Sequence, residues 1–437
     1  MDSFLITGGT PLRGTIDVSG AKNAALPVLA ACVMGRGEST LHAVPRLSDI
    51  DAMLDLMRVL GCRVERSENT TKPSHGGPVL NGPLSIEVTD ESKVEAGYDI
   101  VSRMRASICV LGPLLGARGK AIVSLPGGCA IGDRPVDLHL RGLRKLGAEF
   151  DLKDGNIVAT VKGRLKGARM YLGGANGPTV LGTINVMSAA AMAEGETVIV
   201  GAACEPEVAD VANLLNKMGA RITGHGTPEI KIDGVDKLTA AEHKIIPDRI
   251  EAATFIIAAA ITGGDLTLTN CDLNHLLAVV DQLETIGVKL EETPDGGVRV
   301  TRPGTLSPVE FTTQPYPGFP TDVQAQFVAL LSIAGGMSVI GERIFPERFQ
   351  HLSELNRLGA HVRKEGSTAF IHGVEKLQGA TVMASDLRAS AALVLAGLVA
   401  KGTTRVNRVY HIDRGYEKIE QKLGAVGARI ERVSEKK

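Results

Sequence analysis

The sequence predicts an α/β protein with two similar domains, each made of three repeated strand–helix units packed around buried helices. Three observations predict this fold. The chain has 437 residues, which is more than one ordinary hydrophobic core organises. A short glycine-containing element recurs six times, and a long apolar segment recurs the same number of times. A sixfold repeat spread over a chain of this length fits two sets of three units.

The recurring element consists of an apolar residue, a glycine, a small residue, a variable residue and a second apolar residue. Its glycines are 86, 72, 68, 72 and 68 residues apart, and the polar stretch 65–78 accounts for the longer first interval as a loop insertion. The six copies are LGCRV (60–64), LGAEF (146–150), MGARI (218–222), IGVKL (286–290), LGAHV (358–362) and VGARI (426–430).

The apolar segments predict helices that are buried on every side, because apolar residues cover most of their circumference. Each segment ends in glycine, which suits the left-handed residue that terminates a helix. A short strand pattern and a second, amphipathic helix follow each one. The six segments span 23–37, 106–119, 179–195, 251–264, 322–336 and 389–402.

Composition excludes several classes of function. The formal net charge is −1, with 48 basic and 49 acidic residues, which argues against a general nucleic-acid or membrane-surface binder. We expect no signal peptide and no membrane-spanning segment. The six cysteines include no C-x-x-C pair, which is typical of reduced thiols in the cytoplasm. No metal-ligand spacing is present, so we expect neither a metal nor another cofactor.

The starts of the predicted buried helices carry the first candidate functional residues. Lys22, Arg105 and Arg388 place cations beside helix N-termini, which already carry partial positive charge. Such a cation is unfavourable unless an anion offsets it, so its repetition favours an anion-binding cleft between the domains. The alternative for the polar residues at these starts is simple N-capping, for which three are suitable: Asn176, Asp322 and Asp386.

The second candidate is the glycine-rich loop 125–138, which follows a strand. Cys129 lies at its tip and Arg134 follows five residues later. A basic neighbour favours ionisation of an accessible thiol, which can then act as a nucleophile or acid. From the loop alone, an incidental thiol remains the alternative.

Several segments in the same order along the chain resemble the UDP-N-acetylglucosamine 1-carboxyvinyltransferase family. The fold implied by this resemblance is an enolpyruvyl transferase-like, inside-out α/β barrel in each domain. Residues 22–239 would form the first domain, residues 1–21 and 240–437 the second, and the active site would lie in the cleft between them. The matching segments are GAKNAALP (20–27), RASI (105–108), LPGGCAIGDRPVDLH (125–139), PDRIEAATF (247–255), FPTDVQAQF (319–327), RFQHLSEL (348–355), DLRASAALVLAG (386–397) and YHIDRGYE (410–417).

The resemblance implies transfer of the enolpyruvyl group of phosphoenolpyruvate to UDP-N-acetylglucosamine, the first committed step of bacterial peptidoglycan synthesis. Cys129 would be the proton donor, with a possible covalent adduct, and the epoxide antibiotic fosfomycin would alkylate it. Asp322 would be the base, and Lys22 and Arg414 would complete the catalytic set. Phosphoenolpyruvate would contact Lys22, Asn23, Arg134, Arg348, Asp386, Arg388 and Arg414. The nucleotide sugar would contact Asn23, Arg105, Arg134, Pro135, Val136, Asp137, Leu138, Gly177, Pro178, Thr179, Val180, Asp322 and Ile344.

Two alternatives to this function are an enolpyruvyl transferase of the shikimate pathway and a catalytically inactive paralogue that binds nucleotide sugars. For the leading function we expect small-molecule substrates only, with no nucleic acid, membrane or protein partner needed for catalysis. The sequence predicts no role for the insertion at 65–78.

Overall fold

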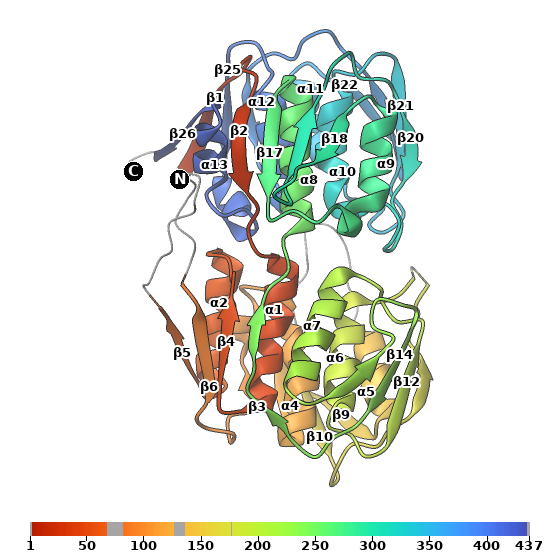
Figure 1. Ribbon diagram of the computed structural model, residues 1–437. Coiled ribbons are helices and arrows are strands. Elements are labelled where there is room, and N and C mark those ends of the chain that lie inside the picture. The colour runs from red at the N-terminus through yellow and green to blue at the C-terminus, as the bar shows by residue number, and fades with distance from the viewer. Residues whose placement is uncertain (1, 68–81, 126–135, 176, 435–437) are drawn as a thin grey trace.

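The computed structural model describes residues 2–67, 82–125, 136–175 and 177–434, which form two lobes (Figure 1). Each lobe has its own hydrophobic core. The core of the first lobe contains residues from Ala21 to Ile245. The core of the second lobe combines Phe4 to Val18 with Ile250 to Val426. The N-terminal strands therefore pack with the C-terminal half of the chain, and the predicted insertion at 65–78 lies almost entirely outside the described residues.

In the described part of the chain, three four-stranded sheets surround the core of each lobe. All six have one topology, in which the first strand runs parallel to the second and the remaining pairs are antiparallel. In the first lobe the strand orders are β16 (Glu242–Lys244), β4 (Glu38–His42), β6 (Leu84–Val88), β5 (Cys62–Arg66); β7 (Glu95–Ala96), β8 (Lys120–Ser124), β10 (Asn156–Val161), β9 (Ala148–Lys153); and β11 (Arg169–Tyr171), β12 (Glu196–Val200), β14 (Glu229–Asp233), β13 (Arg221–Thr223). In the second lobe they are β2 (Arg13–Asp17), β17 (Asp265–Thr269), β19 (Val298–Thr301), β18 (Lys289–Glu292); β20 (Glu310–Thr312), β21 (Met337–Gly341), β23 (Thr368–His372), β22 (His361–Glu365); and β24 (Thr381–Met383), β25 (Thr403–Asn407), β1 (Asp2–Thr7), β26 (Arg429–Ser434).

The predicted buried helices form the centre of each lobe. Most of their residues are buried, as expected for helices that are apolar on every side. They are α1 (Lys22–Ala31), α4 (Leu111–Arg118), α6 (Val180–Ala190), α8 (Arg249–Thr262), α10 (Thr321–Leu331) and α12 (Leu387–Gly397). The segment predicted as a helix from residue 106 begins instead with the 3₁₀-helix η2 (Arg105–Val110). Three further 3₁₀ segments are η1 (Cys32–Met34), η3 (Leu273–Leu276) and η4 (Val409–Arg414).

The second helix of each unit is amphipathic and lies outside the buried helices. In α2, for example, Ile50, Met53 and Met57 are fully buried at helical spacing, whereas Asp55 on the same helix faces solvent. These helices are α2 (Ser48–Val59), α5 (Asp137–Lys145), α7 (Pro206–Lys217), α9 (Leu277–Thr285), α11 (His351–Arg357) and α13 (Ile419–Ala425), and a short α3 (Tyr98–Val101) precedes η2.

The recurring glycine has one conformation in all six units. Its φ angle lies between 81° and 106°, a region that side-chain-bearing residues rarely adopt. The glycine turns the chain from the end of the amphipathic helix into the next strand. The repeat in the sequence is therefore a repeat of helix-terminating turns, and the predicted α/β fold of similar units is confirmed. The strands stay in separate sheets, with no closed barrel among the residues that the structure describes.

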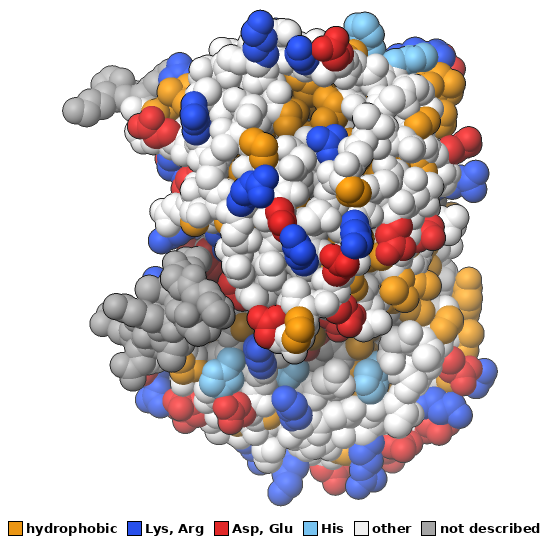
Figure 2. Space-filling view, turned by 45° about the horizontal axis from the view of Figure 1, so that its top comes forward, with side chains coloured by type: hydrophobic (Ala, Val, Ile, Leu, Met, Phe, Trp, Pro, Cys, Tyr) orange, Lys and Arg blue, Asp and Glu red, His pale blue; other side chains and the backbone are white. Residues whose placement is uncertain are grey.

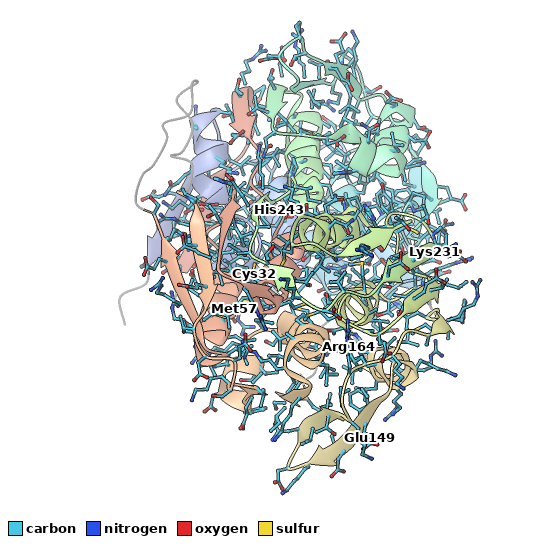
Figure 3. All side chains as sticks on the ribbon, turned by 60° about the horizontal axis from the view of Figure 1, so that its bottom comes forward. Cys32, Met57, Glu149, Arg164, Lys231 and His243 are labelled. Atoms are coloured by element: carbon cyan, nitrogen blue, oxygen red, sulfur yellow. The ribbon has the colours of Figure 1, made fainter. Side chains whose placement is uncertain are left out.

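The chain crosses between the lobes twice, after β2 and after β16. The strand β16 still pairs with β4 of the first lobe, beyond residue 239 at which the sequence analysis ends the first domain. The preceding pair, β15 (Leu238–Thr239) with β3 (Gly35–Arg36), also belongs to the first lobe. In Figure 3, His243 of β16 lies near the second lobe and Glu149 of β9 lies at the far end of the first.

Basic and acidic side chains are interspersed over both lobes on the face shown in Figure 2. This mixture agrees with the near-zero net charge of the sequence. Within the described residues, no helix is long and apolar enough to cross a membrane.

Candidate active site

The N-termini of the buried helices meet the junction of the lobes, and side-chain caps hold three of them. Asp386 accepts hydrogen bonds from the backbone N–H groups of Arg388 and Ala389 at 2.9 and 3.1 Å, which confirms its predicted N-cap role. Asp248 caps α8 in the same way, with bonds of 2.9 and 3.0 Å.

The other two predicted N-caps differ from expectation. The cap of α6 is Thr179, whose hydroxyl accepts the N–H of Gly182 at 3.2 Å, and Asn176 lies outside the described residues. Capping is wrong for Asp322, because Pro320 occupies that position of α10 and the carboxylate bonds to arginines instead.

The first charged cluster joins the two lobes through a buried carboxylate. Asp49, on α2 of the first lobe, lies 2.7 Å from Nζ of Lys22 and 3.0 Å from Nε of Arg414, which ends η4 of the second lobe. The side chains of Asp49 and Lys22 are 6% and 11% exposed. Asp49 thus offsets two cations that the family resemblance predicts to contact phosphoenolpyruvate.

Asp49 was not a candidate from the sequence. It lies in an ordinary amphipathic helix, and its neighbours Asp51 and Asp55 are acidic and exposed. Nothing in the local pattern distinguishes the one carboxylate that points into the junction.

The second charged cluster surrounds Asp322. Nη1 of Arg348 lies 2.7 Å from one carboxylate oxygen and Nη2 of Arg388 lies 3.2 Å from the other. Both arginines are buried, whereas the Asp322 side chain is 27% exposed. The carboxylate is therefore held between two cations with part of its surface open to solvent, a position from which it can reach a bound ligand.

The two clusters belong to one site. Burial lowers the pKa of Lys22, Asp49 raises it, and the positive charges of Arg388 and Arg414 lower it further, so the three cations lie within electrostatic range of one another. The backbone N–H of Lys22 also donates to Asp248 at 3.2 Å. Cations that repel one another in a buried junction form a site for anionic groups.

A buried hydroxyl network supports Arg388. Its guanidinium lies 5.4 Å from the ring centre of Tyr416, whose hydroxyl lies 2.8 Å from Oγ1 of Thr254. Gln326 donates to the Tyr416 hydroxyl at 3.3 Å and to the backbone oxygen of Asp322 at 2.9 Å. These contacts fix the orientation of the arginine and the turn that carries Asp322.

Glu342 organises the loop that contains Ile344 and Arg348. This fully buried carboxylate accepts the backbone N–H groups of Ile344 and Phe345 at 2.8 and 3.0 Å, and the Thr321 hydroxyl at 2.8 Å. Thr321 in turn accepts from Nη1 of Arg348 at 3.1 Å. Ile344 is half-buried beside the start of α10 and so lies close to Asp322.

The first lobe contributes the predicted nucleotide-sugar segments. Leu138 lies against the turn at Gly174, where an added Cβ would come within 2.9 Å of its Cδ1. The same turn pairs Gly174 with Gly177, and a Cβ at Gly177 would lie 3.0 Å from Pro315 of the second lobe. The predicted contacts on Val136, Asp137, Leu138 and on 177–180 are thus brought together beside the other lobe.

Two predicted nucleotide-sugar contacts on the first lobe lie at the starts of buried helices. Asn23 is exposed on α1 directly after Lys22, and Arg105 is half-buried at the start of η2.

Three predicted site residues cannot be placed. Cys129, Arg134 and Pro135 lie outside the residues that the structure describes. In the described chain, no group of three or more histidine, cysteine, aspartate or glutamate side chains is arranged to hold a metal ion.

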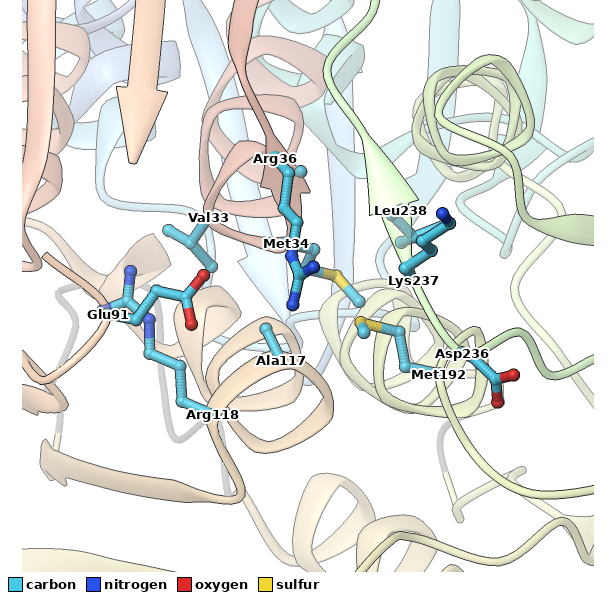
Figure 4. A pocket seen from close by; sticks show the side chains of 11 residues that line it. Val33, Met34, Arg36, Glu91, Ala117, Arg118, Met192, Asp236, Lys237 and Leu238 are labelled. Atoms are coloured by element: carbon cyan, nitrogen blue, oxygen red, sulfur yellow. The ribbon is translucent and has the colours of Figure 1, made fainter. Parts of the chain in front are cut away.

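A small cavity in the first lobe lies apart from this site (Figure 4). Its lining includes Met34, Arg118 and Met192, which follow or end the three buried helices of that lobe. The cavity therefore sits at the C-terminal ends of these helices, whereas the charged clusters sit at their N-terminal ends. None of the predicted site residues lines it.

Comparison with known proteins places the chain among carboxyvinyl transferases. The family model of EPSP synthase (3-phosphoshikimate 1-carboxyvinyltransferase) matches residues 6–423. The chain belongs to the EPSP synthase family of enolpyruvyl transferases. The match confirms the enolpyruvyl transferase relationship expected from the sequence motifs, and the curated relatives confirm the narrower family.

The curated relatives narrow the comparison. Proteins from Methylacidiphilum infernorum (isolate V4) and Nitratidesulfovibrio vulgaris (strain DP4) are each 52% identical, with the full length of both chains covered. Both carry the name UDP-N-acetylglucosamine 1-carboxyvinyltransferase.

Solved structures share the fold. The enolpyruvyl transferase NikO from Streptomyces tendae superposes with a TM-score of 0.85 at 23% identity, covering 99% of this chain and 98% of that one. EPSP synthase from Acinetobacter baumannii gives a TM-score of 0.76 at 19% identity, with all of both chains covered.

Proposed function

We propose that this chain transfers the enolpyruvyl group of phosphoenolpyruvate to the 3′-hydroxyl of UDP-N-acetylglucosamine and releases phosphate. The observation that carries the proposal is the convergence of Lys22, Arg348, Arg388 and Arg414 around two carboxylates where the lobes meet. Full-length similarity to relatives named for this reaction supports it.

The cation set suits the donor substrate. Phosphoenolpyruvate carries a phosphate and a carboxylate, and both need cations to be bound and to offset charge during reaction. Arginine guanidinium groups pair with two anionic oxygens at once, whereas Lys22 supplies a compact charge. The site draws these cations from both lobes, so binding of the donor also favours a defined arrangement of the lobes.

The reaction is an addition followed by an elimination. The sugar hydroxyl oxygen bonds to C2 of phosphoenolpyruvate, the hydroxyl proton passes to Asp322, and the methylene carbon takes a proton from the thiol of Cys129. The tetrahedral intermediate then gives a proton from that carbon back to the thiolate of Cys129 while the bond from C2 to the phosphate oxygen breaks, and the proton held by Asp322 leaves with the released phosphate. A general acid at the methylene carbon and a general base at the hydroxyl are what this chemistry requires.

The two ion pairs of Asp322 affect its role. Two guanidinium groups pair with the two carboxylate oxygens and fix their position. Part of the Asp322 side chain stays exposed, so a bound acceptor can contact it. A hydroxyl polarised by the growing bond to C2 is a stronger acid than a free alcohol, so the carboxylate can take its proton. We propose Asp322 as the residue that orients the 3′-hydroxyl and receives its proton during the addition.

The acceptor would lie against the first lobe. Val136 to Leu138 and Gly177 to Val180 form neighbouring surfaces there, Asn23 follows Lys22 on α1, and Arg105 lies within electrostatic range of His139, next to Leu138. Backbone groups at a helix start, such as those after the Thr179 cap, suit a diphosphate. The predicted roles of Arg134 and Pro135 belong to the same proposal.

Wider aspects of the proposal follow from the reaction. The product is a peptidoglycan precursor, which connects the chain to cell-wall synthesis, cell shape and division in the cytoplasm. Fosfomycin would inhibit the enzyme by alkylating Cys129. We propose that residues 22–239, together with the strand β16 that pairs with β4, form the first domain, that residues 1–21 and the chain after β16 form the second, and that the two close over both substrates to exclude water.

A second candidate function is transfer to shikimate 3-phosphate, because the matching family model carries that name. Phosphate release from phosphoenolpyruvate should be measured with each acceptor separately and with neither. Turnover with UDP-N-acetylglucosamine alone supports the proposal, and turnover with shikimate 3-phosphate alone replaces it. Binding of UDP-N-acetylglucosamine without turnover would indicate the inactive paralogue.

A further inference from the structure

The two segments that cross between the lobes are bonded to each other. Residues 18–21 lead from β2 into α1, and residues 245–248 lead from β16 into α8 beside them (Figure 1). The N–H of Ala21 donates to the Ile246 oxygen at 2.7 Å, and the N–H of Asp248 donates to the Ser19 oxygen at 2.8 Å. The crossovers thus form a two-stranded connection between the lobes.

Space at this connection is restricted. A Cβ at Gly20 would lie 1.9 Å from the backbone oxygen of Ala43, so a side chain cannot fit there. The chain must pass this point in close contact with the first lobe, immediately before Lys22.

A buried ion pair holds the first crossover from the side of the second lobe. Nζ of Lys422, on α13, lies 2.9 Å from Glu251 on α8, and their side chains are 5% and 2% exposed. The ammonium also donates to the backbone oxygen of Asp17 at 2.9 Å and to the Ser19 hydroxyl at 2.7 Å. All three N–H donors of the lysine therefore have acceptors, one at the end of β2 and one on the crossover segment itself.

Glu251 completes the contact. Its second carboxylate oxygen accepts the backbone N–H of Ser19 at 2.6 Å. A charge-assisted hydrogen bond of this length to a backbone group fixes the position of that peptide unit. Ser19 is therefore held by Glu251 at its N–H, by Lys422 at its hydroxyl and by Asp248 at its carbonyl oxygen.

The free-energy cost of burying charges indicates that the Glu251–Lys422 ion pair positions the crossover rather than stabilises the fold. Burying two charges costs several kcal/mol, and a well-packed apolar pair of similar size is often as stable or more so. Removal of one partner, in contrast, leaves a buried charge uncompensated. This charged pair makes hydrogen bonds to Asp17 and to Ser19, where the first crossover begins. An apolar pair could fill the same space but could not hold these polar groups in position.

The path from this pair to the site is short. Ser19 bonds to Asp248, and Asp248 accepts the backbone N–H of Lys22 at 3.2 Å while it caps α8. We propose that Glu251, whose charge Lys422 balances, is a positioning residue that accepts the Ser19 N–H, clamps the crossover there and thereby holds Lys22 among the charged groups of the site. The expected effect of the clamp on enzyme kinetics rests on the proposed function, whereas the existence of the clamp does not.

Two neutral double variants test this inference. Glu251→Leu/Lys422→Met removes both charges and every acceptor for the Ser19 N–H. Glu251→Gln/Lys422→Met also removes both charges but keeps an amide oxygen as acceptor, and it is the matched control. Melting followed by circular dichroism establishes that each variant folds.

The rate of backbone hydrogen exchange, measured without substrate, tests directly whether the crossover at Ser19 is held in place. In the peptide covering residues 17–22, we expect exchange at least tenfold faster in Glu251→Leu/Lys422→Met and near the wild-type rate in the control. The rate of phosphate release then measures the effect on catalysis. We expect kcat/KM for phosphoenolpyruvate to fall at least tenfold in the first variant and less than threefold in the control.

Wild-type exchange in both variants overturns the clamp, and so does equally fast exchange in both. Fast exchange with unchanged kcat/KM overturns the positioning role. If Glu251→Leu/Lys422→Met does not fold, Glu251→Ala/Lys422→Met takes its place, because it also removes the acceptor of the Ser19 N–H; the same tenfold fall in kcat/KM is expected, and no fall overturns the role. Absence of turnover in the wild type would refute the proposed function and leave the exchange result to decide the clamp.

Discussion

Replacement of Asp49 by asparagine tests whether the carboxylate that joins the lobes also prepares the site for phosphoenolpyruvate. Asp49 receives charge-assisted hydrogen bonds from Lys22 and Arg414, at 2.7 and 3.0 Å, with little exposure to solvent. Bonds of this kind contribute about 1.5–3 kcal/mol each. Asparagine keeps one acceptor oxygen and loses the charge, so we expect a loss of about 3 kcal/mol in transition-state binding.

This loss corresponds to a fall of about a hundredfold in kcat/KM for phosphoenolpyruvate. Phosphate release at saturating UDP-N-acetylglucosamine measures it. Asp55→Asn is the matched control, because Asp55 lies on the same helix in a half-exposed pair with Arg58 that should contribute little.

The pH profile of the same reaction adds an independent reading. Burial lowers the pKa of Lys22, and Asp49 opposes that effect while Arg388 and Arg414 add to it. Lys22 must be protonated to bind an anion, so activity is lost as the pH rises through this lowered pKa. Without Asp49 the pKa falls further, and the alkaline limb should move to lower pH. An unchanged limb together with kcat/KM within threefold of wild type would refute the reasoning.

Three further predictions follow from the site and the cores. Asp322→Ala should lower kcat far more than it raises KM for UDP-N-acetylglucosamine, because proton transfer belongs to the transition state; steady-state kinetics with near-normal kcat would remove Asp322 as the base. Fosfomycin should add one covalent adduct at Cys129, and intact-protein mass spectrometry that finds the same adduct on Cys129→Ser would contradict this. Burial lowers the pKa of His139 to about 4, so the unfolded chain binds the extra proton between pH 6.5 and 4 and stability falls as the pH falls through that window, by about 3 kcal/mol. Urea unfolding of His139→Gln should show a shallower pH dependence than the wild type, and an equal slope would show that other groups cause it.

The sequence was a good guide to the units and to the charged groups. The recurring glycines predicted six turns because their φ angles, 81° to 106°, are accessible to glycine at low cost. Lys22, Arg388 and Asp322 were identifiable because charged residues stand out at the start of an apolar helix. Asp49, the partner of Lys22, was not identifiable, and neither was Glu342, which organises the loop of Ile344 and Arg348, because both lie in segments whose local pattern is ordinary.

Asp322 shows the limit of local reasoning. Its position near a helix start fits an N-cap, and the structure instead places it one residue inside the helix between two arginines. Those arginines are 26 and 66 residues away along the chain. Only the packing of two units, and of a distant segment within one of them, could reveal that the carboxylate is committed to ion pairs.

The sequence by itself determined the number of units, their buried helices and the residue types at the helix starts, because these depend on periodicity and backbone conformation within a few residues. Tertiary structure alone decided which charges meet. Lys22 and Asp49 come from one lobe and Arg414 from the other, and the crossover at Ser19 is fixed by side chains more than 230 residues away in sequence. Contacts between residues so far apart in sequence depend on how the cores pack and where the chain crosses between them. Neither can be predicted from a short stretch of sequence.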